Sequence, residues 1–347
     1  MVEIGWYMMK KELKKFLNYL KKNIKGINRS IKLIKKKSDK NSVILFFDMW
    51  WSYIRYGVNY DEYRIFEFYS LPGFKRDTYM SECRHQNLEN YLFDVKHLAI
   101  LTNREKFYIK FKDYLNREYY NIKDLSFKEF EELALKKKEL ICRSNNLKSE
   151  SNTLVLNVKN FRSPAFLLDK AKKSSLNIVE SNIKQNKLFD SINPYNMNTV
   201  SIVTLLCGNK VDIVSSYVKF GIEEEYKYDV NSSKHITGLV DVKSGVIKHK
   251  LVCGEDELYS EHPISKIKLI NLEIPLYDEI KNIAKECAKD FDESLEIEWN
   301  FVISDKKVYL INANLWDDYV FAQLPMFSKN KIGLMPYYRD NVKKRRI

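Results

Sequence analysis

Three asparagines near the C-terminal end of the sequence are spaced so that their side chains could act on one point. The stretch from Leu295 to Asn314 predicts two antiparallel strands joined by a polar Ser-Asp-Lys-Lys turn. Asn300 lies on the first strand, and Asn312 and Asn314 lie two residues apart on the second, so they share a face. Three oxygen-bearing side chains on neighbouring strands could therefore converge on one point, and the alternative is a plain hairpin whose polar residues face water.

The composition is that of a globular protein with about two domains. The chain has 347 residues, 45% of them hydrophobic and 14% aromatic, with only 10 Gly and 7 Pro. It has no uncharged apolar run of about 18 residues, and lysines follow the short N-terminal apolar block, so we predict neither a membrane span nor a signal peptide. Five scattered cysteines without a C-x-x-C pair indicate reduced, mostly buried thiols. We expect a cytoplasmic protein, with peripheral attachment to the inner membrane face as an option.

The net charge of +13 is concentrated at the N-terminus, where residues 1–40 hold 13 Lys and Arg against three acidic residues. Residues 9–36 have the apolar period of an amphipathic helix with lysines on the other face. Through residues 1–37 such a helix could lie on an anionic inner leaflet. It could equally dock on its own domain with a solvated lysine face. Nucleic acid is the least favoured partner, because no nucleic-acid-binding module accompanies the basic segment.

The order of the expected elements predicts an α+β fold class. A helix over 126–137 begins with a capping box formed by Ser126 and Glu129. A small α+β unit follows, and the chain then becomes strand-rich, with one helix over 274–291 before the hairpin. We expect a basic amphipathic helix at residues 1–40 and an N-terminal region at 41–122. A small subdomain at 123–185, a C-terminal subdomain at 186–335 and a basic tail at 336–347 follow.

Five stretches of this sequence resemble the ATP-grasp superfamily, and in particular its sugar-transfer-associated branch, which is found with cell-surface polysaccharide biosynthesis. The likeness covers residues 43–330. The most specific stretch is the segment Asn-Pro-Tyr-Asn-Met-Asn-Thr-Val at 193–200. The others are Arg104-Glu105-Lys106-Phe107, Leu140-Ile141-Cys142-Arg143, the segment 178–185, and Glu298-Trp299-Asn300 with Ile311-Asn312-Ala313-Asn314.

The resemblance implies an ATP-grasp-like fold of two α+β subdomains with a nucleotide cleft between them. It implies ATP and magnesium as cofactors and leaves the catalytic residues unassigned. By resemblance, the nucleotide-binding positions are Lys106, Arg143, Glu180, Lys184, Asn198 and Asp241. The metal positions are Asn300, Asn312 and Asn314. The implied chemistry is carboxylate–amine ligation through an acyl-phosphate, with a sugar, glycan precursor or amino acid as substrate.

The sequence also departs from the family pattern at several positions where the family has charged side chains or glycines. Arg143 stands where the family has a lysine, and Ser201 stands where an arginine often follows. The lid segment 144–152 has no glycine, which restricts the approach of backbone amides to phosphates. Asn300 replaces an aspartate and Asn312 a glutamate, so the Coulombic attraction for magnesium is lost.

Three functional hypotheses follow from these matches and departures. The first is a divergent ATP-dependent ligase of surface-glycan assembly. The second is a catalytically inactive ATP-grasp scaffold that binds a glycan, a partner enzyme or a nucleotide without turnover. The third is an unrelated basic protein that binds membranes or nucleic acid.

Overall fold

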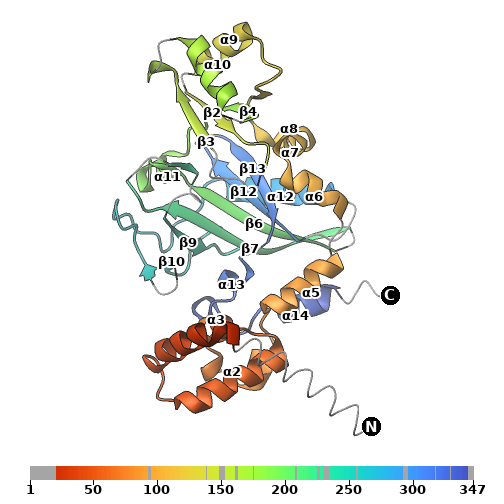
Figure 1. Cartoon of the computed structure of the whole chain (residues 1–347), viewed down its shortest axis with the longest axis vertical. Helices are drawn as coiled ribbons and strands as arrows, with labels where there is room; N and C mark the ends of the chain where they lie inside the picture. Colours follow the sequence, from red (N-terminus) through yellow and green to blue (C-terminus); the bar gives the residue numbers. More distant parts are fainter. Residues whose placement is uncertain are drawn as a thin grey trace. The chain divides into compact units, whose positions relative to one another are not determined.

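The computed structural model describes most of the chain from residue 21 onward, and these residues divide into two compact units. The first unit combines Met1–Tyr91 with Asp317–Ile347, and the second is Leu92–Trp316. Figure 1 shows the helical first unit and the sheet-rich second unit. The described residues are 21–92, 95–137, 139–147, 153–160, 163–174, 176–207, 209–224, 227–229, 234–254, 257–291, 296–316, 318–328 and 330–342.

A seven-stranded antiparallel sheet forms the centre of the second unit. Its strands are in the order β11-β10-β9-β7-β6-β12-β13. The expected hairpin is confirmed at one edge, where Asn300 is opposite Asn312 and the turn is closed by Ser304 N–H bonding to Lys307 O. The strands are β6 (Thr199–Cys207), β7 (Lys210–Gly221), β9 (His235–Leu239), β10 (Leu251–Cys253), β11 (Glu257–Tyr259), β12 (Glu296–Ile303) and β13 (Val308–Leu315).

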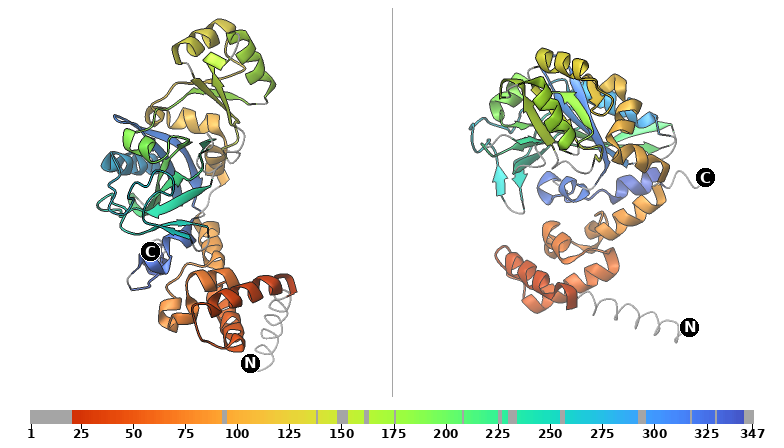
Figure 2. Two further views of the ribbon diagram at one scale, coloured as in Figure 1. Left: turned by 90° about the vertical axis from the view of Figure 1, so that its left-hand side faces the viewer. Right: turned by 45° about the horizontal axis from the view of Figure 1, so that its top comes forward.

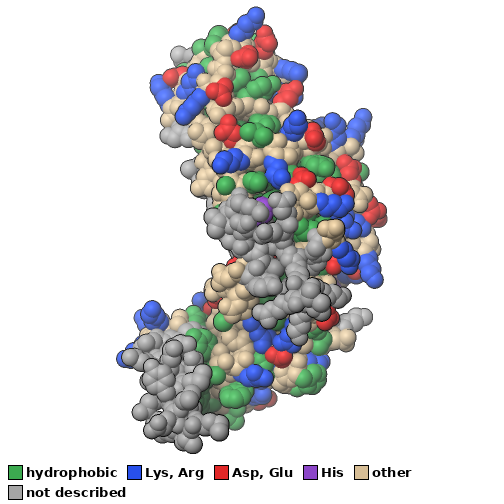
Figure 3. Space-filling model, turned by 90° about the vertical axis from the view of Figure 1, so that its right-hand side faces the viewer, with side chains coloured by type: hydrophobic (Ala, Val, Ile, Leu, Met, Phe, Trp, Pro, Cys, Tyr) green, Lys and Arg blue, Asp and Glu red, His purple; other side chains and the backbone are tan. Residues whose placement is uncertain are grey.

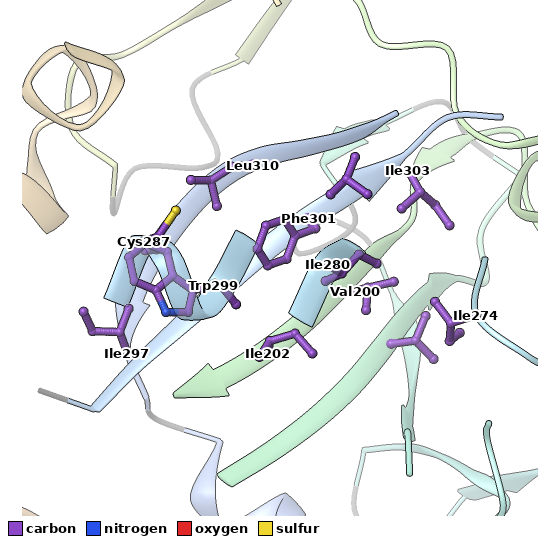
Figure 4. Close-up of a cluster of buried hydrophobic side chains, with 14 of the residues drawn as sticks. Val200, Ile202, Ile274, Ile280, Cys287, Ile297, Trp299, Phe301, Ile303 and Leu310 are labelled. Atoms are coloured by element: carbon purple, nitrogen blue, oxygen red, sulfur yellow. The ribbon is translucent and has the colours of Figure 1, made fainter. Parts of the chain in front are cut away.

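Helix α12 (Tyr277–Lys289) covers one face of this sheet and closes the main core. Because side chains alternate across a strand, β6 and β12 direct Ile202 and Trp299 to the same face. The apolar stripe of α12, with Ile280 and Cys287, packs onto them (Figure 4). The indole N–H of the fully buried Trp299 donates to Thr204 Oγ1 at 2.8 Å.

A smaller antiparallel sheet of order β1-β4-β2-β3 has two helices, α9 and α10, packed on one face (Figure 2). The capping box of α9 is confirmed, since Glu129 and Ser126 exchange hydrogen bonds. Ser163 caps α10 and Pro164 occupies its first turn. The elements are β1 (Tyr119–Asn121), α9 (Phe127–Lys137), β2 (Glu139–Arg143), β3 (Thr153–Asn157), α10 (Pro164–Lys173) and β4 (Ile178–Ser181).

Short elements complete the second unit and connect its two sheets. Phe107 of helix α7 and Phe111, which directly follows the helix, are buried in the main core, where the ring centroids of Phe111 and Trp299 lie 5.3 Å apart. Strands β5 and β8 form a separate parallel pair. These elements are α6 (Val95–Thr102), α7 (Arg104–Lys110), α8 (Lys112–Leu115), η2 (Val158–Asn160), α11 (Lys187–Ile192), β5 (Asn196–Met197) and β8 (Lys227–Asp229).

The first unit is a helical bundle with its own aromatic core. Residues 21–35 form a helix whose Ile27, Ile31 and Ile34 are buried in the same core as Leu45 and Met49. Its elements are α2 (Ser42–Tyr56), α3 (Tyr60–Ile65), η1 (Phe68–Ser70), α4 (Gly73–Arg76), α5 (Glu82–Leu92), α13 (Tyr319–Ala322), η4 (Pro325–Phe327) and α14 (Met335–Val342).

The C-terminal segment belongs to this bundle because polar side chains attach it to the N-terminal helices. The amide of Gln323 accepts from Met80 N–H at 2.7 Å and donates to Met80 O at 3.0 Å. Arg339 forms an ion pair with Asp77 at 2.9 Å. The sequence predicts a helical piece over 317–324, where the structure has α13, but it does not predict α14, whose eight residues contain a proline.

Several expectations are refined by the structure. The helix expected over 274–291 spans Tyr277–Lys289. The sequence has a helical period only over 48–56, but helix α2 begins earlier, at Ser42, because Asn41 caps it by accepting from Val43 N–H. Of the amphipathic helix expected over 9–36, residues 9–20 lie outside the described residues.

Two expectations about cysteines and membrane spans can also be compared with the structure. Cys142, Cys253 and Cys287 are buried, while Cys83 is exposed. Within the described residues, no helix combines the length and apolar character that crossing a bilayer requires.

On the face of the second unit shown in Figure 3, basic and acidic side chains are interspersed among the described residues.

Truncating Trp299 to alanine should destabilise the second unit by about 3–5 kcal/mol, since the change leaves a cavity between β12 and α12 and removes the bond to Thr204. Hydrogen exchange of the β6 and β12 amides measures this loss. Leu135→Ala, at a position that is 64% exposed, is the matched control and should leave protection unchanged. Equal protection in the Trp299→Ala variant and the natural chain would contradict this description of the core.

Candidate functional site

The carboxylate of Glu180 is fully buried among arginines, in what we call the arginine cluster. Arg117 Nε donates to Glu180 Oε2 at 3.0 Å, and Arg143 Nε forms an ion pair with Oε1 at 2.9 Å. The hydroxyl of Tyr108 donates to Oε2 at 2.6 Å and accepts from Arg104 Nη1 at 3.3 Å. The side chains of Arg117 and Arg143 are only 1% and 3% exposed. Three guanidinium groups thus surround one carboxylate and leave an excess of positive charge.

Strand register explains why Arg143 and Glu180 meet. Ile141 is opposite Glu180 across the β2/β4 ladder, and Arg143 lies two residues further along β2, on the same face. Leu140 and Cys142 point the other way, into the core formed with α9 and α10. The arginine cluster therefore lies on the face of the small sheet that those helices leave open.

The arginine cluster keeps Glu180 ionised despite its burial. Burial alone would raise the pKa of this carboxyl. Attraction to Arg117, Arg143 and Arg104, with the hydrogen bond from Tyr108, outweighs burial and holds the pKa of Glu180 below its ordinary value of 4.5. A buried carboxylate of this kind is stable only while its partners stay in place.

The three asparagines of the C-terminal hairpin lie on the face of the large sheet that points away from α12. Asn300 pairs with Asn312 across the ladder, and Asn314 is opposite Glu298. Antiparallel partners share a face, so Glu298 and Glu296 are on the same side as the asparagines. Asn300 Oδ1 already accepts a hydrogen bond from Ser201 Oγ at 2.5 Å. The expected convergence on one face is present, and it includes two glutamates that sequence reasoning did not assign.

The donor set at the three asparagines does not fit magnesium. Mg²⁺ prefers carboxylate oxygens in near-octahedral geometry, whereas all three positions are neutral amides. The hydroxyl of Ser201 engages the oxygen of Asn300. Among the residues that the structure describes, no group of three or more His, Cys, Asp or Glu side chains could hold a metal ion. The side-chain oxygen of Asn300 is therefore engaged within the sheet, and none of the three positions supplies the negative charge that a divalent cation prefers.

Asn198 belongs to a buried hydrogen-bond network and has no free amide group. Its Nδ2 donates to Gln185 Oε1 at 3.1 Å and to Asn193 O at 2.9 Å, while its Oδ1 accepts from Gly221 N–H at 3.2 Å. Gly221 is required here, because a Cβ would lie 1.9 Å from Asn196 Oδ1. Through these hydrogen bonds, the segment 193–200 connects β5, β6 and the end of β7.

The other predicted nucleotide positions lie in separate surroundings. Asp241 closes a tight turn, where the ion pair with Lys248 and the bonds from Ser244 hold the pKa of this carboxyl far below its usual range. Lys106 is exposed in the first turn of α7, and Lys184 is exposed after β4. Of the six predicted positions, the structure joins only Arg143 and Glu180 through a direct contact that it records.

Sequence reasoning missed Arg104, Tyr108 and Arg117, which complete the arginine cluster. Arg104 and Tyr108 are four residues apart, so they lie on one helical face. That spacing was available in the sequence, but nothing in it connected the pair to Glu180, 72 residues away from Tyr108. The link exists only because β4 folds back beside β1 and β2.

Comparison with known families identifies most of the second unit. A family model described as sugar-transfer associated ATP-grasp matches residues 133–339, more than half of the chain. The match includes most of the small sheet and the whole of the seven-stranded sheet. The expected α+β, ATP-grasp-like fold class is thereby confirmed, and the structure also has the N-terminal helices that precede it. No curated protein matches the sequence.

Solved structures with a similar chain path share little sequence with this protein. The ATP-grasp ligase PsnB complexed with minimal precursor has a TM-score of 0.43 at 8% identity, covering 73% of this chain and 64% of that one. Carboxyaminoimidazole ribonucleotide synthase from Aspergillus clavatus complexed with ATP has a TM-score of 0.42 at 8% identity, covering 67% and 50%. The D-alanine-D-alanine ligase from Coxiella burnetii has 0.39 at 12% identity, covering 75% and 60%. This chain thus spans about half to two thirds of their lengths.

Replacing Glu180 by glutamine should destabilise the second unit by about 3–5 kcal/mol, because three guanidinium groups lose the carboxylate that neutralises them. Hydrogen exchange of the β2 and β4 amides measures the effect. Lys248→Met, which removes the partly exposed ion pair with Asp241, is the control and should cost at most about 1 kcal/mol. If the two variants were equally stable, the arginine cluster would have no special structural role.

The same substitution changes the response to acid. Because the folded pKa of Glu180 lies below the unfolded value of 4.5, its stabilising contribution is complete above 4.5 and is lost as the pH falls toward the folded pKa. The natural chain should therefore lose more stability than the Glu180→Gln variant when the pH is lowered from neutrality to below 4.5.

Proposed function

The chain belongs to the sugar-transfer associated ATP-grasp family, and on that premise we propose that it is a catalytically reduced member. In this proposal it has kept the ATP-grasp fold but has converted the positions for ATP and magnesium into internal structure. It then serves sugar transfer as a binding scaffold, for a glycan precursor or a partner enzyme. The family's description as sugar-transfer associated supports the glycan setting.

The observation that carries this proposal is the chemistry of the hairpin. All three positions that the family resemblance assigns to the metal are amides, and Ser201 engages the oxygen of Asn300. In the family pattern, the positions of Asn300 and Asn312 are acids, and their negative charge would hold the cation that neutralises the phosphates of ATP. Neutral amides do not supply that charge. The residues present therefore support folding of the sheet rather than magnesium-dependent phosphoryl transfer.

Arg143, at the end of β2 in the small sheet, also supports catalytic reduction. The resemblance places it where a lysine would contact the phosphates of ATP. Here its guanidinium is 3% exposed and forms an ion pair with Glu180 at 2.9 Å. Contact with a phosphate would require the guanidinium to leave a buried carboxylate, which is a costly exchange. The residue thus contributes to the small sheet as a structural cation.

A second candidate function, a working carboxylate–amine ligase, is favoured by one specific observation. Glu296 and Glu298 lie on the same sheet face as the asparagines, and Glu298 is directly opposite Asn314. These carboxylates, two and four residues before Asn300 on β12, could supply the charge that Asn300 and Asn312 lack. Under this alternative, the chain would form an acyl-phosphate on a sugar or amino-acid carboxylate and pass it to an amine.

The two candidates predict different behaviour toward ATP. Catalytic reduction predicts no amino-acid-dependent ADP release by the natural chain, and an affinity for ATP that changes less than about twofold when Mg²⁺ is added. The Asn300→Asp/Asn312→Glu double variant should gain a dependence on Mg²⁺ of about tenfold, equivalent to about 1.4 kcal/mol. Calorimetry with ATP, with and without Mg²⁺, measures the affinities, and a coupled assay measures ADP release.

Asn87→Asp, at an exposed position on α5, is the control for the added negative charge and should resemble the natural chain. Magnesium-dependent ADP release by the natural chain, abolished by Glu298→Gln, would establish the ligase and overturn the proposal.

A further inference from the structure

Helix α2 is apolar on two opposite sides, which is unusual for a helix at the surface of a domain. Leu45, Met49 and Tyr56 are buried on its inner side. At about 100° per residue, Ile44, Phe47, Trp51 and their neighbours fall on the other side. A helix in a water-exposed position normally places polar residues there.

The outer side of α2 forms a continuous exposed apolar stripe, which we call the α2 stripe. Its members follow helical spacing and include two aromatic rings, a composition that suits the interface between water and lipid. Their exposed fractions are Val43 61%, Ile44 60%, Phe47 53%, Trp51 58% and Ile54 42%.

Positive charge flanks the α2 stripe at both ends. Residues 21–40 hold nine Lys and Arg against the single acidic residue Asp39, and all nine are exposed. Lys36, Lys37 and Lys40 lie in the turn immediately before the stripe, and Arg55 follows it.

The single acid of α2 does not offset this positive charge. Asp48 forms an ion pair with Arg76 at 2.6 Å and accepts a hydrogen bond from Tyr63 at 2.6 Å. Its carboxylate is thereby neutralised within the bundle.

We propose that the α2 stripe and the basic residues around it form a surface that lies on an anionic lipid bilayer. The apolar side chains enter the boundary between headgroups and acyl chains, and the lysines contact anionic headgroups. Helix α2 has 15 residues, about 22 Å of helix, which suits an in-plane orientation and is shorter than a bilayer core of about 30 Å.

The structure also shows which helix would supply the apolar contact. From the sequence, residues 1–37 could either contact a membrane or dock on their own domain. In the described part of that segment, Ile27, Ile31 and Ile34 are buried in the core of the bundle. That helix presents lysines outward, so it contributes charge, and α2 contributes the apolar face.

Charge complementarity favours lipid over the other occupants of such a stripe. A symmetric contact with a second copy would bring two strongly basic segments together, at an electrostatic cost. A nucleic acid would meet the lysines but would leave the apolar stripe exposed to water. An anionic bilayer is the one surface that complements both features at once.

Sedimentation of the full chain with vesicles tests the proposal. Vesicles of phosphatidylcholine with about 30% phosphatidylglycerol should bind the natural chain, and pure phosphatidylcholine should bind it much more weakly. Phe47→Ser/Trp51→Ser should lower the partition coefficient on the anionic vesicles by at least about tenfold. Lys36→Glu/Lys37→Glu should lower the preference for anionic over neutral vesicles.

Ile109→Ser/Leu135→Ser, at positions of the second unit that are 63% and 64% exposed, is the matched control and should bind like the natural chain. Brominated lipids should quench the natural chain more than the Trp51→Phe variant, a readout that does not depend on the amount bound. The proposal is overturned if the Phe47→Ser/Trp51→Ser variant binds as the natural chain does. It is equally overturned if the natural chain ignores vesicles and instead dimerises through this stripe in sedimentation velocity.

Discussion

A carboxylate without access to water has to be neutralised, and the neutralisation of Glu180 connects the parts of the second unit. Its partners come from α7, from the segment before β1 and from the end of β2. Arg117 also donates to Leu310 O of β13 at 3.4 Å. One buried charge therefore joins the small sheet, the connecting helices and the edge of the large sheet. The same contacts hold Arg143, at a position that the family resemblance assigns to the nucleotide, inside the protein.

At the hairpin and in the network around Asn198, polar side chains take part in internal hydrogen bonds. At Asn300 and Asn312 the side chains are neutral, and the sheet satisfies Asn300 through Ser201. Asn198 completes a set of backbone and side-chain bonds at the junction of β5, β6 and β7. Polar residues at such positions stabilise a fold when every donor and acceptor is satisfied. In the proposed function, a family member keeps the ATP-grasp architecture while the charges for phosphoryl transfer are absent.

The fold was predictable from sequence wherever a local pattern determines an element. The capping box at Ser126, the alternating residues of β12 and β13 and the apolar stripe of α12 each specify their own structure over a few residues. The start of α2 was missed because a run of six apolar or small residues hides its period, whereas the cap at Asn41 reveals it. Helix α14 was missed because its eight residues carry no clear apolar stripe.

The candidate site was predictable only in part, because its contacts depend on tertiary structure. Sequence could place Asn300, Asn312 and Asn314 on one face, since register within a hairpin is a local property. It could not show that Glu180 meets arginines from three distant segments, or that Ile27, Ile31 and Ile34 face a core rather than a membrane. In each case the type of residue was clear from the sequence, and its partner was determined by how distant segments pack.

The absence of a functional metal site at the hairpin is tested most directly by crystals of the chain grown with a non-hydrolysable ATP analogue and Mn²⁺. Anomalous scattering locates manganese independently of the phosphates. Our account predicts no anomalous peak beside Asn300, Asn312 and Asn314. A peak at that position, coordinated by the asparagines or by Glu296 and Glu298 and bridging to the nucleotide, would contradict the account.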